Sequence, residues 1–461
     1  MDNESKSFES VRDKADCLND SKPISYMPNG VRRSHDPNGD LEFVRGEGVY
    51  LRDSEGRQYL DFVCGFSSTN FGHAQPRLVQ VAREQLAVLT QIVGLQHPWR
   101  KALEAKLAAF APMSRAAKVW LATSGARAIE VAWKIAYAYR PGKILAFDLA
   151  YHGRSIATAQ ISDTARLPIL QAPLDRLLFY PRCLACPVGL ERTSCNAECF
   201  DSSETWIENH ASDVSAIVVE PAIGARGYYY APPVFFQRLE RIARRLGIVL
   251  IDDEIQMGFG RLGTIFACEK QGWEPDIAIL GKSLGGGIVP IAALVGRADI
   301  MDSLQAGYES ETFAANPLAC RIALESIKLL VDENLLERAK QIEAWLTSGL
   351  HALKIASKHP ILVDAMGASG IIEIMDLLEC KMETMPSNRD RNHFRIPSQH
   401  ISAADIARRW VVQAREAGLL VHLSGEFRNR IVLIPPLIAE RNHIEGAFEI
   451  LMSIVGRDLC R

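Results

Sequence analysis

Lys282 is the residue whose position in the sequence most clearly suggests chemistry. It follows the uncharged run Ile277–Gly281, which is typical of a strand buried on both faces of a parallel sheet, and three glycines come soon after it. The end of such a strand lies at the edge where α/β sheets bind ligands. Reduced hydration there lowers the pKa of a lysine, so its amine can act as a nucleophile or form a Schiff base. A surface lysine before a turn is the simpler alternative.

Small residues after another apolar run could bind phosphate. Ser124, Gly125 and Ala126 follow the strand candidate 117–122 and open a predicted helix. Free N–H groups and the dipole at the start of a helix form a natural anion site. The simpler alternative is an ordinary serine N-cap.

An aromatic residue and two acids complete the set. Each follows an apolar run: Tyr151 and His152 after 144–147, Glu220 after 216–219, and Asp253 after 248–251. An aromatic ring there could stack on a flat cofactor, or could simply pack in the core. A carboxylate that ends a buried strand needs a cationic partner, and a protonated pyridine nitrogen is one. A phosphate seat, an aromatic platform, an acid and a lysine on successive strand ends together predict pyridoxal 5'-phosphate as the cofactor.

The elements that position these residues indicate an α/β protein. Apolar runs alternate with helical patterns after residue 76, which predicts a parallel sheet. The strand candidates are Ala117–Ala122, Ile144–Phe147, Ala216–Val219, Ile248–Ile251, Ile277–Leu280 and Ile291–Val295. Residues 48–62 predict a hairpin, residues 126–140, 403–417 and 440–455 predict helices, and Ile431–Ile434 predicts a further strand. Residues 1–40 are polar and predict a loose arm, and residues 381–400 predict an exposed loop.

Composition narrows the class of protein. The chain has 461 residues, of which 48% are hydrophobic and 23% are charged, with a net charge of -3. This balance argues against nucleic acid as a partner. No apolar run approaches the length that spans a membrane, and the start has no signal-peptide core. With ten cysteines in a long chain, the sequence predicts a cytoplasmic enzyme with reduced thiols.

Motifs in a fixed order give the chain a family resemblance. They are Leu60-Asp61-Phe62 through Gly72-His73, Ser124-Gly125-Ala126, Tyr151-His152-Gly153, Glu220-Pro221, the run Asp253 to Arg261, Gly281-Lys282, the run Thr312 to Leu318, and Pro435-Pro436-Leu437. From about Gly46 to Leu437 the chain resembles the class III, or ω-type, aminotransferases of the aspartate-aminotransferase fold type. The resemblance implies fold type I, with a large parallel-sheet α/β/α domain and a smaller α+β domain made from both chain ends. The expected boundaries are 1–75 for the arm and first part of the small domain, 76–330 for the large domain, and 331–461 for the rest.

The resemblance also implies a role for each site residue. Lys282 would form the Schiff base and move the proton, and Asp253 would pair with the pyridine nitrogen. Gln256 would approach the ring hydroxyl and Tyr151 would stack on the ring, while Gly125 and Ala126 would bind phosphate. Ser124, His152 and Glu220 are expected beside them as cofactor-binding residues. Thr312 would reach the phosphate of the neighbouring subunit, which implies a homodimer.

Departures from the family pattern bear on the substrate. Members that act on α-amino carboxylates usually carry an arginine three residues before the Pro-Pro pair, where this chain has Val432. Arg428 or Arg430 would replace it only after a register shift, and an exposed arginine is the expected outcome. The hypothesis is therefore a terminal-amine donor and a bulky or weakly acidic aldehyde or ketone acceptor. Arg127 stands where the family often has Glu, and no cofactor contact is expected from it.

The sequence leaves several alternatives to transamination. An amino-acid racemase or epimerase on the same scaffold is the main alternative. A non-catalytic relative is disfavoured by the intact lysine, aspartate and glutamine. The match of 258–263 to G-x-G-x-x-G lacks the helix that a dinucleotide site needs, and Asp276 occupies the glycine position that a P-loop would require before Gly281-Lys282-Ser283.

Four clustered cysteines form a second candidate site. Cys183 and Cys186 are followed by Cys195 and Cys199. Two close pairs joined by a short loop suit a tetrahedral zinc site of thiolates, and free thiols or disulfides are the alternatives.

Overall fold

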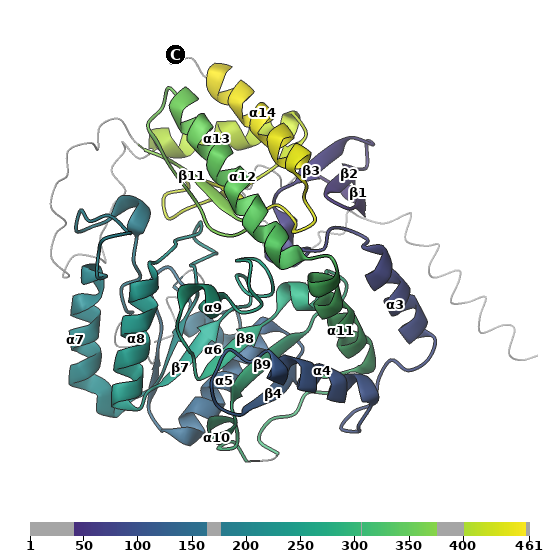
Figure 1. The fold of residues 1–461 in the computed structure, drawn as a ribbon, viewed down its shortest axis with the longest axis vertical. Coiled ribbons are helices and arrows are strands. Elements are labelled where there is room, and N and C mark those ends of the chain that lie inside the picture. The colour runs from purple at the N-terminus through teal and green to yellow at the C-terminus, as the bar shows by residue number, and fades with distance from the viewer. Residues whose placement is uncertain (1–40, 164–176, 306, 376–400, 458–461) are drawn as a thin grey trace, which may run out of the picture. The chain divides into compact units, whose positions relative to one another are not determined.

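The computed structural model describes residues 41–163, 177–305, 307–375 and 401–457. The predicted arm 1–40 and the predicted loop 381–400 lie outside the described residues. Residues 41–461 form one compact unit, drawn as a ribbon in Figure 1. Its described α-helices are α2 Cys64–Ser67, α3 Pro76–Leu86, α4 Pro98–Ala109, α5 Gly125–Tyr139, α6 Ile156–Gln160, α7 Asp201–His210, α8 Pro233–Leu246, α9 Ala267–Gln271, α10 Ala298–Met301, α11 Pro317–Asp332, α12 Leu335–Ala356, α13 Ile401–Glu416 and α14 Arg441–Arg457.

A six-stranded sheet in the order β4-β9-β8-β7-β6-β5 forms the centre of this unit. Its strands are β4 Ala117–Ala122, β5 Lys143–Leu145, β6 Val214–Val219, β7 Val249–Asp253, β8 Ile277–Leu280 and β9 Ala292–Arg297. All six lie at the predicted strand positions, with ends that differ by at most two residues. The strands β5 to β8 are parallel to one another.

The predicted parallel sheet has one exception, β9, which is antiparallel to both β8 and β4. A parallel return needs a long crossover, usually a helix. The segment 281–291 between β8 and β9 holds only the short 3-10 helix η5, Lys282–Gly285. The glycine-rich turn after Lys282 therefore returns the chain directly alongside β8.

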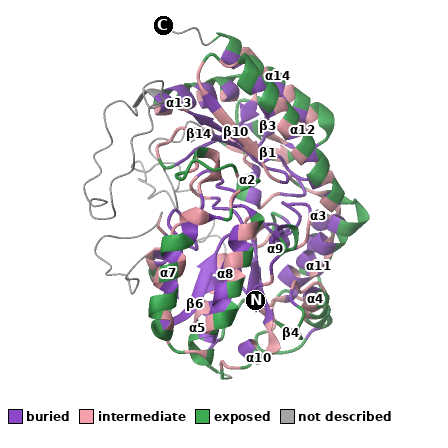
Figure 2. Cartoon of the chain, turned by 60° about the vertical axis from the view of Figure 1, so that its left-hand side comes forward, coloured by how far each residue is buried: buried purple, intermediate pink, exposed green. Residues whose placement is uncertain are grey.

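Both faces of the central sheet are buried. Neighbouring residues of β6 to β8 alternate between two apolar clusters, one containing Ala216 and Ile277 and the other Ile217 and Ala278. The apolar face of α5 packs into the first cluster and that of α8 into the second. Figure 2 shows the buried sheet between helices whose outward faces are exposed. This double coverage explains why the strands read as continuous apolar runs.

Two four-stranded sheets join the ends of the described chain. One has the order β1-β2-β3-β12 and the other β10-β11-β14-β13. Their strands are β1 Phe43–Glu47, β2 Tyr50–Asp53, β3 Gln58–Asp61, β10 Ile361–Ala365, β11 Gly370–Ile374, β12 Leu419–Leu420, β13 His422–Ser424 and β14 Arg430–Leu433. The strand β12, from the later part of the chain, pairs in parallel with β3, from the earlier part. The smaller α+β part therefore contains both ends of the described chain, as the sequence predicted. The domain boundaries at 75 and 330 stay a prediction.

Candidate active site

The predicted site residues lie where the central strands run out. Five of the six strands are followed by, or end in, a polar site residue at the same edge. These residues are Ser124 after β4, Tyr151 after β5, Glu220 after β6, Asp253 at the end of β7, and Lys282 after β8. The carboxyl ends of parallel strands meet at one edge of a sheet, so this placement follows from the topology. Direct contacts between several of these residues show that the edge forms one site.

Asp253 is held by the histidine that the sequence placed beside the cofactor. His152 Nδ1 lies 2.8 Å from Asp253 Oδ2, and both side chains are buried. The other oxygen, Oδ1, accepts the backbone N–H of Ile255 at 3.2 Å. A carboxylate only accepts, so the Nδ1 of His152 carries the hydrogen. His152 therefore orients Asp253, while its own Nε2 is buried without a hydrogen-bond partner among the described residues.

Glu220 follows β6, the strand next to β7, which ends in Asp253. Its carboxylate accepts the backbone N–H groups of Tyr151 at 2.8 Å and Gly224 at 3.2 Å. Burial raises the pKa of Glu220 to about 7, against the opposing charge of His152, and Asp253 adds to the rise. Glu220 thus fixes the backbone that carries Tyr151.

Lys282 enters the site from the turn after β8. Its backbone has a φ of 45°, a left-handed conformation that is uncommon for lysine, and its side chain is half-buried. Burial lowers the pKa of Lys282 to about 8, although the Glu220 and Asp253 carboxylates act in the opposite direction. An amine with this pKa has a much larger neutral fraction near physiological pH than an ordinary lysine, and the neutral form is the one that acts as a nucleophile and proton acceptor.

The start of α5 has the geometry of an anion seat. Ser124 caps the helix by accepting the N–H of Arg127 at 3.3 Å, and Gly125 and Ala126 begin its first turn. A Cβ on Gly125 would lie 2.7 Å from the Cδ1 of Ile255, so only glycine lets this turn approach β7 so closely. The arrangement leaves the first N–H groups of α5 available to a phosphate.

Gln256 bonds a tyrosine from another loop. Its Nε2 donates to Tyr228 Oη at 2.7 Å, and burial raises the pKa of Tyr228 to about 12. Tyr229 and Tyr230 are also buried, and Tyr230 bonds Ser369 at 2.8 Å. These tyrosines therefore shape the wall of the site rather than forming an open aromatic surface.

The loop that carries Thr312 lies against the chain's own α5. Glu311 accepts the N–H and hydroxyl of Thr123 at 2.9 and 2.6 Å and bonds Arg127 Nε at 3.0 Å. Arg127 also pairs with Glu309. Thr312 itself is exposed. Arg127 is therefore engaged by carboxylates, and the absence of a cofactor contact from it stays a prediction.

The residues present fit pyridoxal phosphate. A Cβ on Gly153 would lie 2.7 Å from that of Ala126, so glycine keeps the backbone after Tyr151 next to the phosphate seat. The half-buried Lys282, the oriented Asp253 and the unpaired Nε2 of His152 supply an amine, an acid and a polar atom at one edge of the sheet. No single simpler function accounts for all of these features together.

Sequence reasoning missed the role of Arg261. Its guanidinium is fully buried, donates to the carbonyls of Ala368 and Pro435 at 2.7 and 2.6 Å, and bonds Asn70. It therefore ties three distant segments together beside Lys282, whose pKa it lowers. An arginine within the glycine-rich run 258–263 was the available signal, and the absence of a helix there agrees with rejecting a dinucleotide site.

A buried acid pair behind Asp253 predicts a pH-dependent stability. Asp252 and Glu254 lie within 4.8 Å of each other, and Glu254 accepts the backbone N–H groups of Ala267 and Cys268. Burial, and then the charge of Glu254, raises the pKa of Asp252 well above its usual value, while burial raises that of Glu254 to about 6. The folded chain thus holds protons that the unfolded chain releases, so stability falls as pH rises above about 4, through the raised pKa values.

Replacing Asp252 with Asn should therefore flatten this dependence, because the amide keeps a donor toward Glu254 at every pH. We expect the melting temperature of Asp252→Asn to fall less than that of the native chain between about pH 5 and pH 8. Thermal scans at one heating rate measure this. The exposed Glu416→Gln is the matched control, and equal slopes for all three proteins would contradict the assignment.

The four clustered cysteines lie on a separate insert, residues 181–200. All four are free thiols that line one small cavity. Among the described residues, however, no three of these sulfur atoms lie within 4.8 Å of one another. The structure brings the four thiols together without setting them at ligand spacing.

No helix in the described part of the chain combines the length and the apolar character needed to cross a membrane.

The chain is similar in sequence to a known protein family and to several known proteins. Residues 32–455 match the family described as "Aminotransferase class-III". The chain is 35% identical over 439 residues to 4-aminobutyrate aminotransferase GabT of Escherichia coli (strain K12), covering 92% of this chain and 95% of that protein. It is 32% identical to a leucine/methionine racemase of Thermococcus litoralis (strain ATCC 51850 / DSM 5473 / JCM 8560 / NS-C), covering 93% of both chains.

A solved structure has the same fold. An amine transaminase from an uncultivated Pseudomonas species, solved in the PLP-bound form, superposes with a TM-score of 0.82 at 26% identity. The match covers 95% of this chain and 99% of that one. The fold is therefore fold type I, as the sequence predicted.

Proposed function

Because this chain belongs to the class III aminotransferases, we propose a specific division of labour among its residues for pyridoxal phosphate-dependent transfer of an amino group. Pyridoxal phosphate, when bound, supplies an electron sink for the carbon that loses a proton. Lys282 Nζ would hold the cofactor covalently, and its amine would take and return that proton. The observation that carries this role is the position of Lys282 in the turn after β8, at the sheet edge where Asp253 ends β7. Burial there lowers the pKa of Lys282 to about 8, although the Glu220 and Asp253 carboxylates act in the opposite direction.

The other residues bind and orient the cofactor. Asp253, fixed by His152, would accept from the protonated ring nitrogen. Gln256, fixed by Tyr228, would bind the ring hydroxyl. Tyr151 would stack on the ring, and the first turn of α5 from Ser124 to Ala126 would bind the phosphate. Glu220 acts by holding the Tyr151 backbone.

Product analysis tests this function against the racemase alternative. The similarity to the Thermococcus litoralis racemase is the reason to test it. A transaminase consumes a carbonyl acceptor and releases the carbonyl form of the donor in equal amounts. We expect both products to depend on the acceptor. Inversion of an amino acid with no acceptor consumed would show a racemase instead.

We propose that the donor is a terminal amine and that the acceptor is a bulky or weakly acidic aldehyde or ketone. Val432 is fully buried on β14 and presents no charge. The expectation that Arg430 would be exposed is wrong, because it is 2% exposed and bonds Glu373 at 2.7 Å. Its guanidinium also stacks 3.7 Å from the centre of the Tyr229 ring. Because Glu373 and Tyr229 hold the guanidinium of Arg430, this side chain does not form a bidentate pair with a substrate carboxylate.

A panel of donors checks this specificity. Single-turnover conversion of the bound cofactor should be fastest with terminal amines, slower with ω-amino acids, and slowest with acidic α-amino acids. A bidentate charged contact contributes about 1.5–3 kcal/mol, so its loss predicts roughly a tenfold or greater preference. Stopped-flow absorbance measures the rates. Fast conversion by acidic α-amino acids alone would contradict the hypothesis and implicate Arg428.

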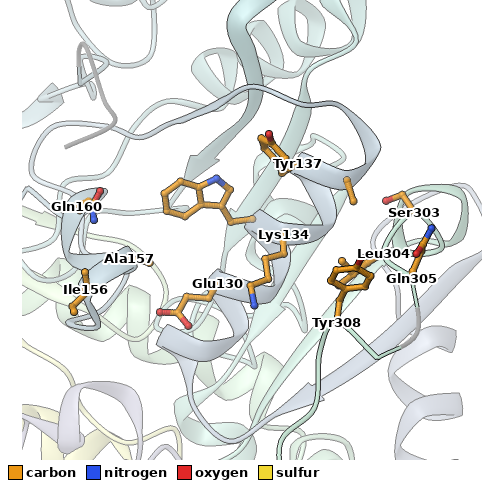
Figure 3. Close-up of a pocket in the computed structure, with 12 residues that line it drawn as sticks. Glu130, Lys134, Tyr137, Ile156, Ala157, Gln160, Ser303, Leu304, Gln305 and Tyr308 are labelled. Atoms are coloured by element: carbon orange, nitrogen blue, oxygen red, sulfur yellow. The ribbon is translucent and has the colours of Figure 1, made fainter. Parts of the chain in front are cut away.

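We propose a homodimer in which Thr312 binds the phosphate of the neighbouring subunit. Thr312 is exposed, and the flanking aromatic residues Tyr308 and Phe313 are 69% and 62% exposed. Beside Tyr308 lies a groove of about 970 Å³ between α5, α6 and residues 303–305, which Tyr137 and Tyr308 help to line (Figure 3). Exposed apolar residues on this scale are typical of a surface that a second chain covers. A cytoplasmic location also remains a prediction.

A mixed dimer shows whether Thr312 serves the site of its own chain or that of the neighbouring subunit. Combining one Lys282→Ala chain with one Thr312→Glu chain creates a complete site only if Thr312 serves its neighbour. We expect light scattering to give about 102 kDa, twice the 51.1 kDa chain, and the mixed dimer to recover about half of native activity, because one of its two sites is intact. The two parent dimers are the controls. A fully active monomer, or a mixed dimer no better than its parents, would end the proposal.

A further inference from the structure

The insert 181–200 gathers four thiols that the amino-transfer site does not use. Cys183, Cys186, Cys195 and Cys199 line a cavity of about 10 Å³, which has room for about one water-sized particle. All four are free and partly buried. The other described cysteines, at 64, 268 and 320, are instead buried among apolar residues of the core.

Contacts on several sides hold the insert around this cavity. Arg192 forms a bidentate pair with Asp364 of β10, at 2.5 and 3.0 Å. Arg238 of α8 donates to the carbonyls of Asn196 and Ala197 at 2.8 and 3.1 Å. The backbone of the insert is therefore anchored to β10 of a small sheet and to α8, and its four thiols line the cavity between these anchors.

The chemistry of the donors selects the ligand class. Four sulfur donors in the spacing C-x₂-C and C-x₃-C match a tetrahedral structural zinc site, and thiolates exclude hard cations such as Ca²⁺ and Mg²⁺. No oxidant is needed, as it would be for two disulfides, and no inorganic sulfide, as for an iron–sulfur cluster. We propose that Cys183, Cys186, Cys195 and Cys199 bind one Zn²⁺ ion, which draws the two halves of the insert together. Each thiol releases a proton as it binds.

The insert also contacts the wall of the amino-transfer site. Leu184 packs against the apolar cluster that contains Tyr228 and Val432. Arg182, next to Cys183, bonds Asp148 at 3.0 Å, and Asp148 accepts the N–H of Tyr180. A bound ion would thus stabilise this wall from outside, as a structural rather than a catalytic metal. The proposal does not depend on the assigned transamination.

Metal analysis of the purified holoenzyme tests the site. We expect about one zinc per chain, and titration with a mercurial reagent should release it as about four thiols react. Cys183→Ser and Cys199→Ser should each lose most of the zinc, lower the melting temperature and expose the insert to proteolysis. Cys320→Ala, a buried thiol in α11, is the matched control and should keep its zinc.

Other outcomes overturn the proposal. These are a metal-free native chain with four reactive thiols after growth with added zinc, two disulfides by mass spectrometry, iron in place of zinc, or zinc that remains when all four cysteines are replaced. The mercurial titration needs only the native chain, so a variant that fails to fold does not weaken the test. Replacing the zinc with Co²⁺ should give the intense charge-transfer bands of a tetrathiolate site, and their absence would exclude four sulfur ligands.

Discussion

The Lys282→Ala variant is expected to lose at least about 10⁴-fold in transamination rate, because one side chain supplies both the covalent anchor and the proton carrier. Alanine removes the amine without disturbing the strand, since β8 ends at Leu280. Steady-state rates with saturating pyridoxal phosphate measure the loss. A small primary amine in the buffer should restore part of the rate, because it can replace the missing proton carrier.

Two controls separate chemistry from folding in this test. Lys270→Ala removes a lysine that pairs with Glu343 at the surface, and it should leave the rate within a few-fold of native. Circular dichroism should show the same secondary structure in all three proteins. A Lys282→Ala enzyme within tenfold of the native rate would remove Lys282 from the mechanism.

The Asp253→Asn variant should lose roughly 10³-fold while keeping the cofactor covalently attached. Asp253 is buried, and removing one member of a buried acid–pyridinium pair costs about 3–5 kcal/mol. An amide cannot hold the ring nitrogen protonated, so the electron sink is weakened while Lys282 remains intact. Turnover and the visible absorbance of the bound cofactor are measured on the same sample.

The neighbouring acid provides a close control for Asp253. Asp252 is equally buried on β7 but lies in the pair with Glu254. Asp252→Asn should therefore change stability and leave turnover within a few-fold of native. Near-native turnover in Asp253→Asn, or equal losses in both variants, would refute the role of Asp253.

The sequence predicted the framework of the site because that framework follows from local patterns. Buried parallel strands require continuous apolar runs, and their ends meet at one edge. The polar residues after those runs, from Ser124 to Lys282, therefore had to come together. The helix 126–140 was confirmed as α5, since Ser124 caps it and Pro141-Gly142 ends it.

Features that depend on distant partners could not be predicted in this way. The burial of Arg430 depends on Glu373 of β11 and on Tyr229, residues far away in the sequence. The same applies to His152 and Asp253, which lie 101 residues apart and were assigned separate roles. An apolar run also gives no direction, so the antiparallel return of β9 followed only from the short connection before it.

The central claim is that Lys282 holds the cofactor in the site formed at this sheet edge. Its most direct test is to reduce the holoenzyme with borohydride, digest it, and locate the modified lysine by mass spectrometry. We predict a pyridoxyl-phosphate adduct on Lys282 at about one per chain, and none after prior treatment with a donor amine. An adduct on a different lysine, or no adduct on a catalytically active enzyme, would contradict the account.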